Sequence, residues 1–332
     1  MWPIRQSNGA SPRRPFPICF TPILRKELPV PIRIADNLPA RRTLEAEGVI
    51  VMGETEAARQ DIRPLRIALL NLMPDKITTE TQIARLLGAT PLQIELTLVR
   101  LSGHVSKTTS AGHIAEFYRP FDEIQTERFD GLIITGAPVE TMAYGEVTYW
   151  DELRRIFDWS QTHCHRLLTI CWGAMAALHY FHGVPKHPLA AKAHGVFDHE
   201  VRASGSPWLR GMSDVVPVPV SRWSEVRSAD LPAGLTVLLE SEESGLCLVD
   251  DPARRALHML NHLEYDTLTL DTEYRRDGSG PVPRHYYRND DPANLPRNTW
   301  RTHGHQLFGN WINEVYQTTP FDLADVGAVL QV

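Results

Sequence analysis

Short runs of hydrophobic residues recur along the middle of the chain. The runs at 65–72, 129–135 and 167–170 are almost uninterrupted, which is typical of strands that are buried on both faces. The run at 92–99 alternates with polar residues, which predicts a strand nearer an edge of the sheet. These runs therefore predict a sheet that occupies the interior of the protein.

Helical spacing of hydrophobic residues fills the segments between these runs. Thr79 and Gln82 form a possible capping box, which predicts that a helix begins there. A second predicted helix presents a hydrophobic face made of Trp150, Leu153, Ile156 and Phe157. Because strands alternate with helices, we expect an α/β fold with a mainly parallel sheet and helices on both faces.

The pattern changes in the last third of the chain. Shorter hydrophobic runs at 235–239, 245–249 and 256–260 follow one another closely, which predicts antiparallel strands added to the sheet. Beyond them we expect a helix at about 265–276 and a last helix at about 298–316, joined by a long loop rich in Pro, Asn, Asp and Gly.

Residues 1–29 differ from the rest of the chain. They are rich in proline and arginine and contain little hydrophobic surface that could be buried, so we expect a disordered or wrongly assigned extension. We hypothesise that the native chain starts at Val30 and that residues 30–332 form a single domain.

Composition narrows the class of protein. With 42% hydrophobic and 22% charged residues among 332, the chain is typical of globular proteins. The formal net charge of −6, with basic residues spread along the chain, gives no indication of nucleic-acid binding. No hydrophobic run is long enough for a membrane helix, and four cysteines without a CxxC pair favour a reducing compartment, so we expect a cytoplasmic protein.

The hydrophobic run at 167–170 changes to helical spacing at Cys171. Gly173 and several alanines follow, which would let a helix pack close to the sheet. This pattern resembles a nucleophile elbow, a sharp strand-to-helix turn that exposes one side chain at the sheet edge. A thiol at a helix N-terminus is favoured as thiolate, the reactive form. The alternative is a buried cysteine that packs as a small hydrophobic residue.

A nucleophilic cysteine needs a base, and the base needs a group that orients it. His262 and Glu264 stand two positions apart at the predicted end of a strand, so both could point the same way. The alternative is a surface histidine beside a solvated carboxylate. Seven histidines lie between His163 and His199, but their spacing fits no common zinc motif, and we expect no metal.

Five segments together resemble the homoserine O-acyltransferases of methionine biosynthesis, which are related to class I glutamine amidotransferases. The resemblance covers residue 30 to the end. The segments are Asn71–Lys76, Ile134–Pro138, Ile170–Ala174, His262–Asp266 and Pro296–Trp300. This resemblance implies a flavodoxin-like α/β fold, a homodimer, and no permanently bound cofactor.

The resemblance also implies a role for each matching residue. Cys171 would form an acyl-thioester, with His262 as general base and Glu264 as its orienting acid. The substrate would bind at Lys192 and Ser221, and Arg276 would bind the carboxylate of homoserine. The oxyanion hole would consist of backbone N–H groups of Trp172 and Ala137.

The resemblance ties the choice of acyl donor to Glu140. Relatives that use succinyl-CoA have glycine at this position, whereas glutamate accompanies acetyl-CoA. A glutamate would repel the terminal carboxylate of a succinyl group, so we expect acetyl-CoA as the co-substrate. The same reaction with succinyl-CoA is the nearest alternative. Hydrolysis or glutamine amide transfer by the same residues, and a binding protein without catalysis, remain open alternatives.

Overall fold

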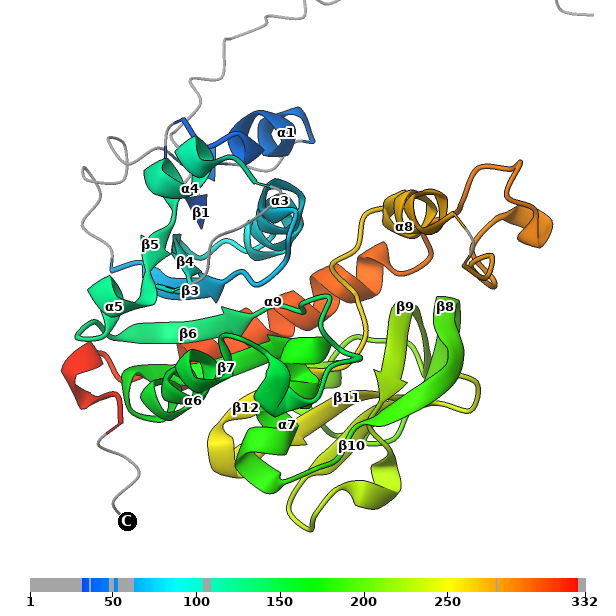
Figure 1. The fold of residues 1–332 in the computed structure, drawn as a ribbon. Coiled ribbons are helices and arrows are strands. Elements are labelled where there is room, and N and C mark those ends of the chain that lie inside the picture. The colour runs from blue at the N-terminus through cyan, green and yellow to red at the C-terminus, as the bar shows by residue number, and fades with distance from the viewer. Residues whose placement is uncertain are drawn as a thin grey trace, which may run out of the picture.

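A computed structural model describes residues 32–35, 37–47, 51–52, 63–103, 109–278 and 280–327 (Figure 1). The expectations for residues 1–29 and for a chain start at Val30 lie outside the described residues. The strands are β1 (Ile32–Arg33), β2 (Val51–Met52), β3 (Leu65–Leu70), β4 (Ile94–Arg100), β5 (Arg119–Pro120), β6 (Phe129–Ile134), β7 (Cys164–Ile170), β8 (His187–Val201), β9 (Val215–Glu225), β10 (Thr236–Ser241), β11 (Gly245–Asp251) and β12 (Ala256–Met259). The helices are α1 (Ala40–Ala46), α3 (Lys76–Leu87), α4 (Ala111–Phe117), α5 (Phe121–Ile124), α6 (Trp150–His163), α7 (Trp172–His182), α8 (Thr269–Asp277) and α9 (Arg301–Thr318).

The strands join one sheet in the order β2-β1-β4-β3-β6-β7-β12-β11-β10-β8-β9, with β5 paired to β4. Pairing is parallel from β2 to β12 and antiparallel from β12 to β9. The predicted mainly parallel sheet with antiparallel additions is therefore confirmed. β12 joins the two halves because it pairs parallel with β7 and antiparallel with β11.

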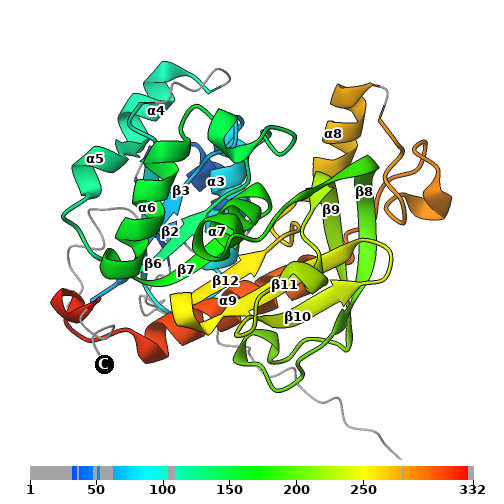
Figure 2. The ribbon, with the colours of Figure 1, turned by 60° about the horizontal axis from the view of Figure 1, so that its bottom comes forward.

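Helices cover both faces of the parallel half (Figures 1 and 2). Side chains of α1, α3 and α9 pack with β3 and β4 in one hydrophobic cluster, which includes the fully buried Trp311. Side chains of α5, α6 and α7 pack in a second cluster on the other face, around Phe157 and Trp172. The sheet is buried on both faces because its central strands are hydrophobic at almost every position.

Some sequence predictions of local structure were wrong. The helix α3 begins at Lys76, where Asp75 accepts a hydrogen bond from the backbone of Thr78, so Thr79 and Gln82 form no capping box. The predicted position of the run at 92–99 nearer an edge is confirmed, because only the two-residue strands β1 and β2 lie between β4 and the edge of the sheet. The two longest strands, β8 and β9, had not been predicted. None of the described helices has an apolar stretch long enough to cross a membrane.

Two glycines on α9 differ in what surrounds them. A Cβ on Gly304 would lie 2.5 Å from the backbone oxygen of Leu263, whereas a Cβ on Gly309 would meet nothing within 4 Å. The close approach at Gly304 lets α9 pack directly against the backbone between His262 and Glu264. Glycine is required at the first position and only tolerated at the second.

This contrast gives a stability prediction. Gly304→Ala should lower the free energy of unfolding by about 1–3 kcal/mol, because the backbone at Leu263 must move. Gly309→Ala should raise it by about 0.5–1 kcal/mol through helix propensity alone. Urea unfolding of both variants measures the difference, and equal effects would contradict the packing described.

Candidate active site

The order of the strands reverses between β3 and β6, because β3 pairs with β4 on one side and with β6 on the other. In such sheets ligands bind outside the carboxyl ends of the strands at this point. A cleft with a cavity volume of about 240 Å³ lies there. Its lining includes Met73, Thr135, Gly136, Ile170, His262 and Glu273.

Cys171 forms the turn between β7 and α7 with φ of 51°, a left-handed conformation that is strained for a side chain other than glycine. Its backbone N–H donates to Met259 O at 2.7 Å. Small residues allow the turn to fit: a Cβ on Gly136 would lie 3.1 Å from Cys171 Cβ, and one on Gly173 would lie 2.6 Å from Thr135 O. The predicted strand–turn–helix geometry at Cys171 is therefore present.

His262 and Glu264 lie in the turn after β12, because that strand ends at Met259. The prediction that both would sit on a strand ending was wrong, yet the two side chains still meet: His262 Nδ1 and Glu264 Oε1 are 2.7 Å apart. The His262 ring is buried, which alone would lower its pKa. Coulombic attraction to Cys171 and Glu264 and hydrogen bonds to both side chains outweigh burial and hold the pKa of His262 well above its usual range. Cys171, His262 and Glu264 thus form one interacting group.

Arg222 on β9 is a buried cation that the sequence had not indicated. It is 2% exposed and donates to Asn261 Oδ1 at 3.2 Å and to Ser224 O at 3.0 Å. Burial lowers the pKa of Arg222, and the neighbouring Cys171 is among the acidic groups that counteract this. A guanidinium stays charged in such surroundings, so Arg222 places a permanent positive charge near Cys171.

Lys192, Ser221 and Arg276 come together around the last turns of α8. Ser221 Oγ donates to Glu273 Oε2 at 2.5 Å, and Lys192 Nζ lies 3.9 Å from the same oxygen. Lys192 and Arg276 both donate to Asp277, at 2.9 Å each. Glu273 and Arg276 line the cleft that holds His262. Glu273 links these residues, and no sequence motif had singled it out.

Glu140 lies in the loop after β6, near the charged groups of the site. Burial raises the pKa of Glu140, while a hydrogen bond from the Trp223 backbone and the charges of His262, Arg222 and Lys192 act to lower it. Glu140 Oε2 has no hydrogen-bond partner among the described residues. This oxygen is therefore buried, and the charges of His262, Arg222 and Lys192 act on the carboxylate.

The two expected oxyanion donors flank Cys171. Trp172 is the first residue of α7, so its N–H is one of the four that have no acceptor within the helix. Ala137 directly follows Gly136, whose Cα lies close enough that an added Cβ would contact Cys171. Both backbone N–H groups remain candidates for stabilising a tetrahedral oxyanion.

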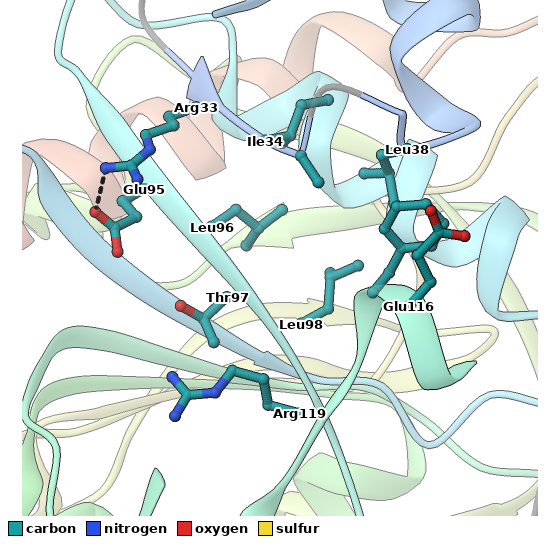
Figure 3. A pocket seen from close by; sticks show the side chains of 11 residues that line it. Arg33, Ile34, Leu38, Glu95, Leu96, Thr97, Leu98, Glu116 and Arg119 are labelled. Atoms are coloured by element: carbon teal, nitrogen blue, oxygen red, sulfur yellow. Dashed lines mark hydrogen bonds and ion pairs between the residues drawn. The ribbon is translucent and has the colours of Figure 1, made fainter. Parts of the chain in front are cut away.

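A second cavity and the possibility of a metal site offer fewer reactive side chains than the cleft. A cavity of about 300 Å³ near β1 and β4 is lined by Leu96, Leu98 and the Arg33–Glu95 ion pair, and by neither cysteine nor histidine (Figure 3). Within the part of the chain that the structure describes, no three histidine, cysteine or acidic side chains are grouped to hold a metal ion. The cleft beside Cys171 is the better candidate for an active site.

Comparison with known proteins identifies the family. The model of the family described as "HTS: Homoserine O-succinyltransferase" matches residues 31–321. The chain belongs to the homoserine O-succinyltransferase family. A relative from Novosphingobium aromaticivorans, named homoserine O-acetyltransferase, is 72% identical over 300 residues, which cover 90% of this chain and 100% of the relative. A relative of the same name from Brucella canis is 59% identical over 306 residues, covering 90% and 100%.

Solved structures confirm the fold class. The structure of a glutamine amidotransferase from Thermotoga maritima aligns with this chain at a TM-score of 0.51 and 13% identity. The alignment covers 77% of this chain and 98% of that chain. At this identity the likeness concerns the fold alone. The family model and the relatives confirm the predicted family, and the solved structure confirms the likeness to the glutamine amidotransferase fold.

The raised pKa of His262 gives a prediction about stability and pH. A group whose pKa is raised by folding stabilises the protein fully below its unfolded pKa, about 6.5 for histidine, and loses this contribution as pH rises through the folded pKa. We expect NMR titration to place the midpoint of His262 above 6.5, and Cys171→Ala to lower it. An unchanged midpoint in Cys171→Ala would contradict the interaction with Cys171.

Proposed function

We propose that this protein is a homoserine O-acetyltransferase, which transfers the acetyl group of acetyl-CoA to the hydroxyl of L-homoserine. The observation that carries the proposal is the contact of Cys171, His262 and Glu264 beside the cleft, in a chain of this family. The product, O-acetyl-L-homoserine, is a precursor for methionine synthesis. We infer a cytoplasmic enzyme, and a homodimer stays a prediction.

In the first half-reaction the Cys171 thiolate attacks the carbonyl carbon of acetyl-CoA. The negative charge that develops on the carbonyl oxygen is stabilised by the N–H groups of Trp172 and Ala137. The bond from carbon to the sulfur of CoA then breaks, and His262 gives its proton to the departing thiolate. Free CoA leaves, and the acetyl group stays on Cys171 as a thioester.

In the second half-reaction neutral His262 takes the proton of the homoserine hydroxyl while its oxygen attacks the thioester. The ester bond forms, the bond from carbon to Cys171 sulfur breaks, and the thiolate–imidazolium pair returns. Arg276 would hold the homoserine carboxylate through its guanidinium. Glu273 is the matching partner for the ammonium group, because it is a carboxylate that lines the same cleft.

The choice of acetyl-CoA depends on Glu140. The family is named for succinyl transfer, whereas the relatives above are named for acetyl transfer. A succinyl group would bring a second carboxylate next to that of Glu140 in a place where burial already raises the pKa of Glu140. Repulsion at low local dielectric, together with the volume of the side chain, favours the smaller and uncharged acetyl group.

A direct test of the catalytic residues measures CoA release. Acetyl-CoA alone should give a burst of CoA, and Cys171→Ser or His262→Asn should reduce turnover about a thousandfold or more. Glu264→Gln should cost about a hundredfold or more because the imidazole loses its orienting charge. Cys164→Ser, a buried cysteine at the other end of β7, is the matched control and should stay active.

Full turnover by Cys171→Ser would refute the proposal, and glutaminase activity without any CoA-dependent burst would instead favour the glutamine amidotransferase reaction.

Donor competition tests the role of Glu140. The wild type should prefer acetyl-CoA over succinyl-CoA, and Glu140→Gly should shift the ratio of kcat/KM toward succinyl-CoA by about tenfold or more. Glu140→Gln removes the charge and keeps the volume, so it separates the two causes. Glu146→Gln, an exposed residue of the same loop, should leave the ratio unchanged. A wild type that prefers succinyl-CoA would overturn the assignment of the donor.

A further inference from the structure

Tyr265 connects two parts of the site that the mechanism treats separately. Its ring is stacked on the His262 ring, with centroids 4.1 Å apart and an angle of 18° between the planes. Its hydroxyl donates to Glu273 Oε1 at 2.8 Å. One side chain therefore contacts both the proposed base and the carboxylate proposed to receive homoserine.

The position of Tyr265 is fixed by its surroundings. The indole Nε1 of the fully buried Trp300 donates to Tyr265 O at 2.8 Å, and the tyrosine itself is 8% exposed. Burial and the charge of Glu273 raise the pKa of Tyr265 well above its usual range, so its hydroxyl stays a donor. Two buried contacts and a ring stack hold the side chain in one orientation.

Glu273 uses both of its oxygens in this arrangement. Oε1 accepts from Tyr265, and Oε2 accepts from Ser221 at 2.5 Å with Lys192 at 3.9 Å. His194 Nε2 lies 3.8 Å from Oε2. A carboxylate held at both oxygens cannot rotate freely, so it offers a substrate ammonium a fixed direction of approach.

We propose that Tyr265 is a positioning residue with two separable roles: its hydroxyl orients Glu273 for homoserine, and its ring holds and stabilises the protonated His262. This proposal rests on the proposed function. Tyr265 bonds to none of the reacting atoms, so it acts through its two neighbours. The hydroxyl should matter in the second half-reaction, and the ring should matter in both.

The ring role has a pH signature because an aromatic face stabilises a nearby cation. The charged or ionisable groups that face His262 are Cys171, Glu264, Glu140 and, through Cys171, Arg222. Removing the ring while keeping these groups destabilises the imidazolium and hence its pair with the thiolate. Alkylation of Cys171 should then need a higher pH.

Two substitutions separate the roles. Tyr265→Phe keeps the ring, so the CoA burst with acetyl-CoA alone should stay within about threefold of wild type, while kcat/KM for homoserine falls about tenfold to a hundredfold. Tyr265→Leu should in addition slow the burst about tenfold and raise the pH midpoint of Cys171 alkylation by iodoacetamide. Tyr316→Phe, on the half-exposed Tyr316 of α9, is the matched control and should change neither.

Several results would overturn the proposal. These are wild-type homoserine kinetics in Tyr265→Phe, an equal loss of the burst and of the homoserine step in that variant, or an unchanged alkylation midpoint in Tyr265→Leu. Thermal unfolding identifies a Leu variant that fails to fold, in which case Tyr265→Phe alone decides the hydroxyl role. Absence of a burst in the wild-type enzyme would instead refute the proposed function, so the two failures are distinguishable.

Discussion

The left-handed turn at Cys171 is the constraint on which the rest of the site depends. Holding a cysteine at φ of 51° costs about 1–3 kcal/mol, and the surrounding structure must supply that energy. The hydrogen bond from the backbone N–H of Cys171 to Met259 O holds the turn against β12. The close approach of Gly173 to Thr135 fixes the start of α7 against the end of β6. The same strand β12 leads directly into His262, so one set of contacts sets the distance between the thiol and the imidazole.

Buried charge is the second feature that shapes the site. Three charged side chains of the site are less than a tenth exposed: His262, Glu264 and Arg222. His262 and Glu264 are hydrogen-bonded to each other, and Arg222 donates a hydrogen bond to Asn261. Isolated charges would be costly to bury, so the group is stable only as a connected set. Tyr265 extends the set to Glu273, so the residues proposed for substrate binding and for proton transfer are linked by one side chain.

The sequence predicted the parallel half of the fold well, because each buried strand there is a continuous hydrophobic run followed by helical spacing. Cys171 stood out because its turn is encoded locally, by a hydrophobic run before it and small residues after it. The spacing of His262 and Glu264 also indicated a pair, although both lie beyond the strand.

The strand β8 has no regular alternation of buried and exposed positions, and it contains a proline. The strand β9 does alternate in burial, but two prolines interrupt it and its last buried side chains are Arg222 and Ser224, so its sequence does not alternate between hydrophobic and polar residues. Lys192, Ser221 and Arg276 entered only through resemblance to a family, because strand pairing brings them together across many residues of chain. Arg222, Glu273 and Tyr265 went unnoticed for the same reason: their importance lies in contacts between β9, α8 and the turn after β12. Such contacts have no signature in local sequence.

The central claim is that the sulfur of Cys171 carries the acyl group. The most direct measurement mixes the enzyme with isotopically labelled acetyl-CoA, quenches in acid without homoserine, and maps the label to a peptide by mass spectrometry. The account predicts stoichiometric label on the peptide that contains Cys171, removed when homoserine is added before the quench. Label on another residue, or a fully active enzyme that never carries label, would contradict it.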